Sequence, residues 1–250
     1  MTMTTTRTAL ITGASRGIGL GIAHRLARQG FSLTITARDG ARLDAVAADL
    51  RGAGAAEIVT VAADMADEDG LDRVLAGHAD RFGAMSALIL NAGIGTASPI
   101  AADATTRRFD KTVAVNLRAP LRLIQGALPM LRAAASADPA RGAKVVALSS
   151  ITGVYAEAGL AVYGATKAAL VSLLTTLNAE ESGNGVAATT LAPGYVDTEM
   201  SAWIHDRIPP ERMLAVDDVV EMVDAVLRLS ARAVVPTIVL SRAGTDGYRA

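Results

Sequence analysis

Short apolar runs alternate with longer segments of helical period along almost the whole chain, and this alternation restricts the fold most strongly. Strands are predicted at the apolar runs, over 8–12, 32–36, 58–62, 87–90, 144–148, 186–191 and 237–241. Helices are predicted between them, up to Gln29 and near 41–50, 67–82, 105–134, 163–182 and 217–230. Strands that are apolar throughout are buried on both faces, as in parallel sheets. The pattern therefore predicts an α/β fold, a doubly wound parallel sheet of about seven strands with helices on both faces.

The composition fits one folded domain over 1–250, because a chain of this length can bury a large core. Hydrophobic residues make up 51% and charged residues 20%, which excludes a disordered chain. The balance of 24 basic and 25 acidic residues argues against nucleic acid as a partner. The sequence has no cysteine, which excludes disulfides, thiolate metal sites and a cysteine nucleophile. Its histidines, at 24, 78 and 205, lack metal-ligand spacing, so we expect no metal.

The first residues, MTMTTTR, do not form a basic segment followed by a long apolar one. We therefore expect no signal peptide. No apolar run approaches the ~18 residues of a membrane helix, so no membrane partner is expected. These observations favour a cytoplasmic protein.

A glycine-rich turn, ITGASRGIG, follows the first predicted strand and opens the first predicted helix. Glycines allow a tight turn and let backbone N–H groups approach a pyrophosphate at the helix N-terminus. A glycine-rich turn alone is often no more than a turn, but this position favours dinucleotide binding. The predicted cofactor-binding residues here are Thr12, Gly13, Ser15, Arg16, Gly17, Ile18 and Gly19.

The residues after the second strand bear on the choice of cofactor. Arg38 lies just beyond this strand, and Arg16 lies in the glycine turn. Arginines suit the 2′-phosphate of NADP(H), whereas a carboxylate at this point suits the ribose of NAD(H). Asp39 could be that carboxylate, or it could cap the helix that begins near Ala41. We favour NADP(H), with NAD(H) as the alternative.

Several motifs occur in one order along the chain: TGASRGIG at 12–19, NAG at 91–93, Asn116 in VAVNLRAPL, LSS at 148–150, YGATK at 163–167 and PGYVDT at 193–198. Together they resemble the short-chain dehydrogenase/reductase family over roughly residues 7–200. The resemblance implies a Rossmann-like fold and an NAD(P)-dependent oxidoreductase that interconverts a carbonyl and a secondary alcohol. It also implies a homodimer or homotetramer.

Tyr163 and Lys167 share one helix face, because residues four apart are neighbours on a helix. A nearby ammonium lowers a tyrosine pKa from its usual ~10, although desolvation opposes this effect. Tyr163 is therefore the candidate general acid/base, and Ser150 could hydrogen-bond the same substrate oxygen. The resemblance implies that Lys167 also binds the nicotinamide ribose and that Asn116 holds a water in a proton relay. Taken singly, each residue could be ordinary packing or a solvated surface group.

Other cofactor contacts follow from the resemblance. Asp64 and Met65 would bind the adenine edge, and the NAG motif would pass close to the adenosine ribose. Asn91 could equally steady the central strand through side-chain hydrogen bonds. The residues concerned are Asp64, Met65, Asn91, Ala92, Gly93, Pro193, Gly194, Val196 and Thr198.

Substrate selection is expected in a lid around 199–212, where Met200 and Trp203 supply apolar area. Tyr155 either lines the substrate pocket or is loop packing, and Ser150 would also contact substrate. These residues predict a small-molecule carbonyl or alcohol substrate of partly apolar character. One alternative is a regulator that senses the dinucleotide without turnover, but it would not need Ser150, Tyr163 and Lys167.

Overall fold

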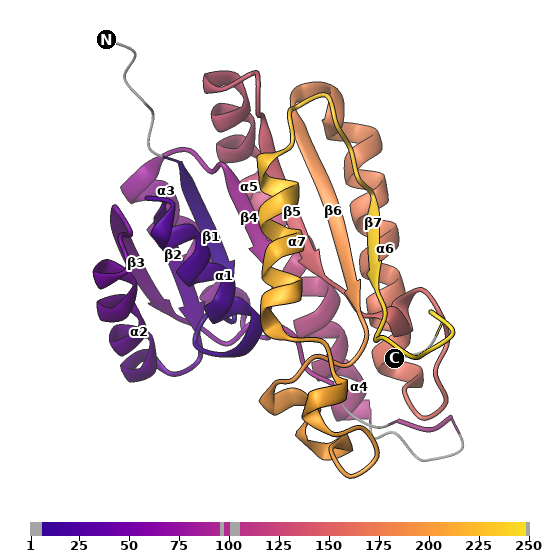
Figure 1. Ribbon diagram of the computed structural model, residues 1–250. Helices are drawn as coiled ribbons and strands as arrows, with labels where there is room; N and C mark the ends of the chain where they lie inside the picture. Colours follow the sequence, from indigo (N-terminus) through magenta and orange to yellow (C-terminus); the bar gives the residue numbers. More distant parts are fainter. Residues whose placement is uncertain (1–6, 96–97, 101–105, 249–250) are drawn as a thin grey trace.

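A computed structural model describes residues 7–95, 98–100 and 106–248. The N-terminal segment 1–6, expected to contain no signal peptide, lies outside these ranges, as does residue 105 of the predicted helix 105–134. Within them the chain forms a seven-stranded sheet, and every neighbouring pair of strands is parallel. The strands lie in the order β3-β2-β1-β4-β5-β6-β7 (Figure 1). This arrangement confirms the predicted doubly wound fold.

The strand bounds agree closely with the apolar runs of the sequence. They are β1 Thr8–Thr12, β2 Ser32–Ala37, β3 Glu57–Ala62, β4 Ala87–Leu90, β5 Ala143–Leu148, β6 Val186–Pro193 and β7 Thr237–Leu240. The α-helices are α1 Gly17–Arg28, α2 Gly40–Gly52, α3 Glu68–Phe82, α4 Thr106–Val113, α5 Ala119–Ala137, α6 Ala161–Glu181 and α7 Val216–Arg228.

The segment predicted as one helix over 105–134 differs from the expectation. Here α4 and α5 are joined by a π-helical segment, η1 (Ala114–Arg118). A π-helical turn carries an extra residue per turn and is found frequently at functional sites. Helix α5 then continues to Ala137, three residues beyond the predicted end.

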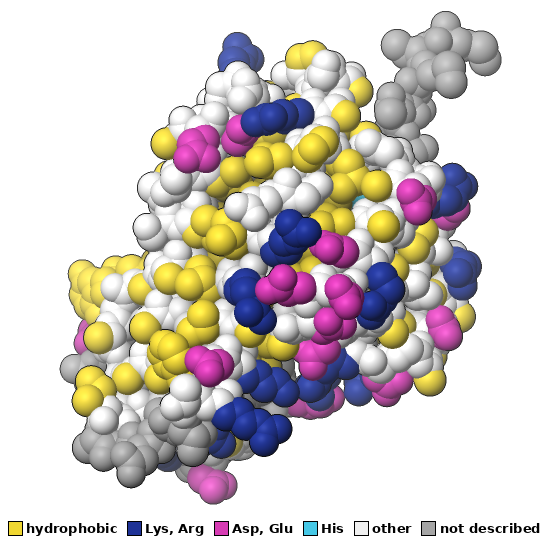
Figure 2. Space-filling model, turned by 180° about the vertical axis from the view of Figure 1, so that it is seen from behind, with side chains coloured by type: hydrophobic (Ala, Val, Ile, Leu, Met, Phe, Trp, Pro, Cys, Tyr) yellow, Lys and Arg dark blue, Asp and Glu magenta, His cyan; other side chains and the backbone are white. Residues whose placement is uncertain are grey.

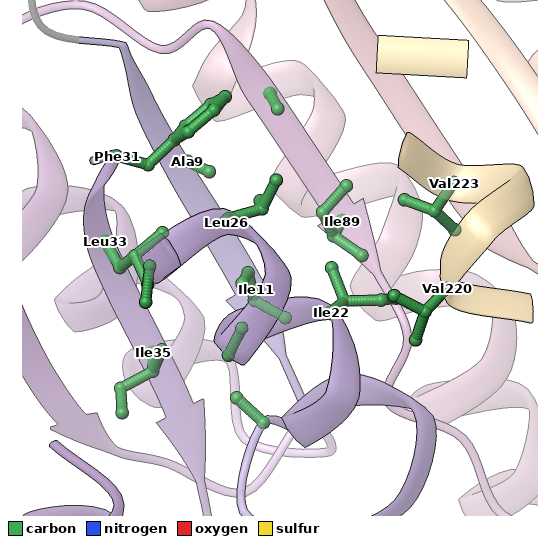
Figure 3. Close-up of a cluster of buried hydrophobic side chains, with 14 of the residues drawn as sticks. Ala9, Ile11, Ile22, Leu26, Phe31, Leu33, Ile35, Ile89, Val220 and Val223 are labelled. Atoms are coloured by element: carbon green, nitrogen blue, oxygen red, sulfur yellow. The ribbon is translucent and has the colours of Figure 1, made fainter. Parts of the chain in front are cut away.

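Each strand supplies side chains to both faces of the sheet. Ala9 and Ile11 of β1 join one hydrophobic cluster, with residues of α1, α2 and α7 (Figure 3). Leu10, between them, joins another cluster with residues of α3, α5 and α6. Successive side chains of a strand point to opposite faces, so a run such as TALIT must be apolar throughout.

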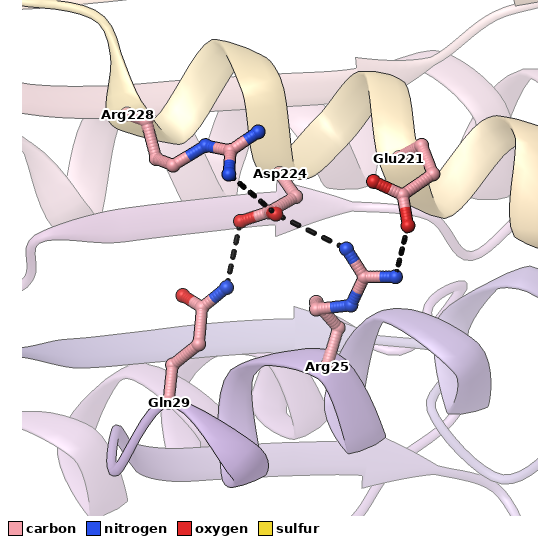
Figure 4. A network of polar contacts seen from close by, with 5 residues as sticks. All are labelled: Arg25, Gln29, Glu221, Asp224 and Arg228. Carbon is pink, nitrogen blue, oxygen red and sulfur yellow. Dashed lines mark hydrogen bonds and ion pairs between the residues drawn. The ribbon is translucent and has the colours of Figure 1, made fainter.

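The network around Asp224 joins α1 to α7 (Figure 4). The Asp224 carboxylate is 4% exposed and accepts hydrogen bonds from Arg25 at 3.1 Å and from Gln29 at 2.7 Å. Arg228, one turn further along α7, lies 3.5 Å from the same carboxylate. The network holds α7 against α1, the helix that the glycine turn opens.

Short 3-10 segments complete the chain: η2 (Ile151–Gly153), η3 (Ser182–Asn184), η4 (Glu199–Ile204) and η5 (Pro210–Arg212). Figure 2 shows basic and acidic side chains interspersed over the face opposite to that of Figure 1. In the described ranges, no helix has both the length and the apolar character of a membrane span.

Candidate active site

A cavity of about 1030 Å³ lies where the carboxyl ends of the strands meet. The chain changes direction across the sheet between β1 and β4, and ligands of such sheets bind at this switch point. Most of the predicted site residues line the cavity: Gly13, Ser15, Arg16, Gly17, Ile18, Arg38, Asp64, Met65, Asn91, Ala92, Gly93, Ser150, Tyr163, Lys167, Pro193, Gly194, Val196, Thr198, Met200 and Trp203.

The glycine turn has the geometry of a phosphate cradle. Gly13 and Gly17 have φ of +66° and +54°, a region that favours glycine. A Cβ on Gly19 would come within 2.3 Å of the Gly13 carbonyl oxygen. Among the described residues no side chain caps the N-terminus of α1, so its N–H groups are available to an anion. The turn therefore fits the pyrophosphate of a dinucleotide.

Thr12 and Asn91 support the wall of the cavity through hydrogen bonds across the switch point. Thr12 Oγ1 accepts from the backbone N–H groups of Asn91 and Ala92, both at 3.0 Å. The Asn91 amide donates to the carbonyls of Thr12 and Gly13 at 3.0 and 3.1 Å. Asn91 therefore steadies the central strands, as one of its two predicted roles requires. Thr12 and Gly19 lie behind the wall and do not line it.

Arginine side chains gather at the end of the cavity beside the glycine turn. Arg38 is exposed there, and Arg16 forms an ion pair with Glu199. Arg42 donates from Nε to the Ser15 carbonyl at 3.1 Å and lies 3.8 Å from Glu199. The positive charge suits a phosphate group, and Glu199 neutralises part of it.

Asp39 caps α2, as one of the two interpretations predicted. Its carboxylate accepts a hydrogen bond from the Arg42 backbone N–H at 3.1 Å. A carboxylate at Ncap satisfies a backbone donor that has no partner within the helix. Asp39 also lines the cavity, so the cap role does not by itself remove it from the cofactor site.

Tyr163 lies at the opposite end of the cavity, near the start of α6. Burial raises the pKa of Tyr163 to about 12, while its hydrogen bond with Ser150 acts in the opposite direction. Desolvation therefore prevails over the lowering that the sequence led us to expect from Lys167. At neutral pH the side chain is a phenol, which can donate a proton.

Ser150 lies two residues beyond the end of β5 and caps η2. Its Oγ accepts hydrogen bonds from the backbone N–H and the hydroxyl of Thr152, at 3.2 and 3.0 Å. A serine hydroxyl has one proton to donate, so the Ser150 proton remains available toward Tyr163 and the cavity. Neighbouring Ser149 instead donates to the Lys167 carbonyl at 2.9 Å, which is a structural contact.

Lys167 is 4% exposed, one turn along α6 from Tyr163. Its Nζ donates to the Leu148 carbonyl at 2.7 Å and lies 5.6 Å from the centre of the Tyr163 ring. Burial lowers the pKa of Lys167 to about 8. A Cβ on Gly93 would lie 3.3 Å from this Nζ, so a glycine there leaves room beside the ammonium.

Asn116 is buried in the π-helical segment and does not line the cavity. Its Oδ1 accepts from the Ile94 N–H, and its Nδ2 donates to the Ile94 carbonyl, both at 2.9 Å. Nδ2 also lies 3.2 Å from the Thr166 hydroxyl. Asn116 therefore clamps the strand-end loop that carries Gly93 and Gly95 past Lys167 and Tyr163.

The predicted substrate residues divide between two places. Met200 and Trp203 line the cavity from η4, with 52% and 58% of their surface exposed. Tyr155 is not among the described residues that line it, which agrees with the second of its two predicted roles, loop packing. Its ring packs edge-on against Tyr248 at 5.0 Å, because the loop after η2 runs against the C-terminal segment.

Sequence reasoning missed Glu157 and Tyr195, which line the cavity at its Tyr163 end. Tyr195 belongs to the PGYVDT motif, and Glu157 is the acidic residue of an apolar loop. The sequence contains both residues, but no fixed spacing connects Tyr195 with Glu157, so it does not predict that they meet. Arg42 and Glu199 were missed for the same reason. In the described ranges, no three acidic or histidine side chains gather where they could hold a metal.

Comparison with known proteins agrees with this geometry. The family model described as short chain dehydrogenase matches residues 7–208. The 3-oxoacyl-acyl-carrier-protein reductase MabA of Mycobacterium avium is 32% identical over 203 residues, covering 81% of this chain and 72% of that protein.

Solved structures in complex with NADP and with NADH are similar to this one. A short chain dehydrogenase from Burkholderia cenocepacia, in complex with NADP, has a TM-score of 0.82 and 31% identity, covering 94% of this chain and 95% of its own. A 3-ketoacyl-(acyl-carrier-protein) reductase from Brucella melitensis, complexed with NADH, has a TM-score of 0.82 and 27% identity, covering 94% and 96%.

Proposed function

The chain belongs to the short-chain dehydrogenase family, and we propose that it is an NADP(H)-dependent reductase that converts carbonyls to secondary alcohols. The observation that carries this proposal is the shared cavity. It joins a phosphate cradle at one end to Ser150, Tyr163 and Lys167 at the other. A molecule that only sensed the dinucleotide would have no use for a half-buried tyrosine beside a buried serine and a buried lysine at the second end.

The nicotinamide cofactor supplies hydride exchange when it is bound. The glycine turn would hold its pyrophosphate, and Arg16, Arg38 and Arg42 would hold a 2′-phosphate. Asp64, Met65 and Asn91–Gly93 line the cavity, and the adenosine would lie against them. Pro193, Gly194, Val196 and Thr198 would flank the nicotinamide, and Lys167 would bind its ribose.

Tyr163 and Ser150 act on the substrate oxygen. The Ser150 hydroxyl donates a hydrogen bond to this oxygen and stabilises the negative charge that develops on it. Tyr163 donates its proton to the same oxygen, which suits a phenol whose pKa is raised to about 12. In the reverse direction the phenol must first lose its proton, so we propose that alcohol oxidation needs a higher pH than carbonyl reduction.

Lys167 supplies positive charge beside Tyr163, which stabilises the phenolate left after proton transfer. Asn116 keeps the Gly93–Gly95 loop in place, which leaves room for the ammonium and for the phenol ring. Four expectations stay predictions from the sequence. They are a water held by Asn116 for proton relay, the cytoplasmic location, the homodimer or homotetramer and the substrate lid around 199–212.

A second candidate is reduction of a 3-oxoacyl thioester, the reaction for which the mycobacterial relative is named. The 32% identity favours it. The two reactions share Tyr163 chemistry and differ in the substrate that the η4 side of the cavity accepts.

The test is NADPH consumption by the purified protein with a panel of aryl ketones, alkyl ketones and a 3-oxoacyl thioester. We expect ketone-dependent oxidation of NADPH that is slower with NADH. Cofactor binding without consumption across the whole panel would contradict the proposal and favour a dinucleotide sensor.

A further inference from the structure

Glu157 places a carboxylate at the catalytic end of the cavity without a complete set of partners. It lies in the loop between η2 and α6 and lines the cavity together with Ser150 and Tyr163. Its Oε1 accepts a hydrogen bond from the Tyr195 hydroxyl at 3.0 Å. Its Oε2 is shielded from solvent and has no hydrogen-bond partner among the residues that the structure describes.

Tyr195 fixes the orientation of this carboxylate. Burial raises the pKa of Tyr195, and the charge of Glu157 raises it further. Tyr195 therefore remains a phenol and keeps donating to Oε1. Its ring also packs edge-on against Trp203, with 6.1 Å between ring centres. Oε2 is left without a donor, in a residue that lines the cavity together with Trp203.

A shielded carboxylate oxygen without a donor is energetically unfavourable, and a ligand that supplies the donor removes this cost. Glu157 is also close enough to Tyr163 for its charge to raise the pKa of that phenol. A substrate whose carbonyl meets Tyr163 therefore extends toward the carboxylate. Substrate anions at this position would be repelled, which adds to selectivity.

Building on the proposed function, we propose that Glu157 determines substrate specificity by accepting a hydrogen bond from a hydroxyl or ammonium group of the substrate. The favoured substrate class is then a hydroxy ketone or an amino ketone with an apolar portion. Met200 and Trp203 would contact that apolar portion. Glu157 does not exchange a proton with the reacting carbonyl in this scheme.

The test compares ketones that differ in one group. Propiophenone carries a methyl group where α-hydroxyacetophenone carries a hydroxyl and α-aminoacetophenone an ammonium. The γ-hydroxy ketone of the same series places its hydroxyl farther from the carbonyl than the α-hydroxy ketone does. For each, kcat/KM is measured with NADPH in the wild type and in Glu157→Gln, which keeps the shape and an acceptor for Tyr195.

We expect the wild type to prefer at least one donor-bearing ketone over propiophenone, and Glu157→Gln to reduce that preference at least about tenfold. A greater loss for the amino ketone would identify an ammonium, and a greater loss for a hydroxy ketone would identify a hydroxyl. Glu180→Gln is the matched control, because Glu180 is exposed on α6 and outside the cavity lining. In Glu180→Gln, the ratio of kcat/KM for each donor-bearing ketone to kcat/KM for propiophenone should equal the wild-type ratio.

Two contrary results can be told apart. Equal preference ratios in the wild type and Glu157→Gln, with ketones consumed by both, would overturn this inference and leave the proposed function intact. An absence of NADPH consumption with every ketone in the wild type would overturn both.

Discussion

Burial displaces the pKa values of Tyr163 and Lys167 in opposite directions, because desolvation disfavours the charged form of each. The tyrosine keeps its proton over the whole neutral range, while the lysine is half deprotonated at about pH 8. We therefore expect the ammonium of Lys167, rather than the ionisation of Tyr163, to set the upper pH limit of the proposed reduction.

A pH–rate profile checks this assignment. We expect kcat/KM for ketone reduction with NADPH to be level below about pH 7 and to fall to half at about pH 8. Lys167→Met should be slower by at least about a hundredfold and should lack this falling limb. The same limb in Lys167→Met would show that another group titrates.

We expect the charge of Arg16, Arg38 and Arg42 at the end of the cavity beside the glycine turn to determine the cofactor preference. We expect Arg38→Asp to weaken NADPH binding at least about tenfold and NADH binding far less, because it replaces a phosphate partner with a repelling carboxylate. The shift in melting temperature on titration with each cofactor measures the effect. Equal losses for both cofactors would mean that Arg38 does not contact the 2′-phosphate.

Glu199→Gln should change NADPH affinity in the opposite direction to Arg38→Asp. Glu199 forms an ion pair with Arg16 and lies 3.8 Å from Arg42. Removing its charge should tighten NADPH binding by up to about fivefold, the effect of one exposed ion pair. Weaker binding of NADPH in this variant would contradict a competing role for Glu199.

The sequence predicted the residues whose chemistry depends on short spacings, and it missed those that meet only in three dimensions. Tyr163 and Lys167 are four apart on one helix, so the pair is readable from the chain. Glu157 and Tyr195 are 38 residues apart and come from a loop and a strand end. Nothing in the sequence predicts that hydrogen bond.

At the scale of elements, the strands were predictable because both faces of each are buried. The bounds of β1 and β4 equal the predicted ones, and the other strands differ by at most two residues at an end. The π-helical segment was not predictable, because its extra residue per turn leaves the apolar pattern of α4 and α5 almost unchanged. It places Asn116 against Ile94.

The contact between α1 and α7 can be tested by one substitution. Asp224→Asn removes the buried charge that binds Arg25, Gln29 and Arg228. We expect the free energy of unfolding to fall by about 2 kcal/mol, because hydrogen bonds to a charged group are lost. In a chain of this size the melting temperature should fall by about 4–8 °C.

Asp49→Asn is the control for that substitution. Asp49 is exposed on α2, and a surface change of this kind should alter the free energy of unfolding by less than about 0.5 kcal/mol. Equal effects of the two substitutions would show that the network does not stabilise the fold.

The stability of the whole molecule should depend on pH through His78, which is fully buried between α3 and the sheet. The Thr34 hydroxyl lies 2.8 Å from Nδ1, and Nε2 lies 3.1 Å from the Ala84 carbonyl. Burial lowers the pKa of His78 to about 4. The unfolded chain, with a pKa of about 6.5, then binds more protons between these values.

The contribution of neutral His78 to the free energy of unfolding is therefore fully present above pH 6.5 and is lost as the pH falls toward 4. We expect His78 to account for a loss of up to about 3 kcal/mol over this window. Urea unfolding at several pH values measures it. His78→Gln should be less stable at pH 7 but should lose less on acidification, and an identical pH dependence would contradict the assignment.

The proposed reaction needs both ends of one cavity, a dinucleotide held at the glycine turn and a proton donated by Tyr163. The most direct measurement is kcat/KM for ketone reduction by Tyr163→Phe, with NADPH affinity and melting temperature measured alongside. Tyr155→Phe is the matched control, since Tyr155 packs against Tyr248 away from the cavity. We predict a loss of at least about a hundredfold in Tyr163→Phe and activity close to wild type in Tyr155→Phe. Unchanged turnover in a folded, NADPH-binding Tyr163→Phe protein would contradict the proposal.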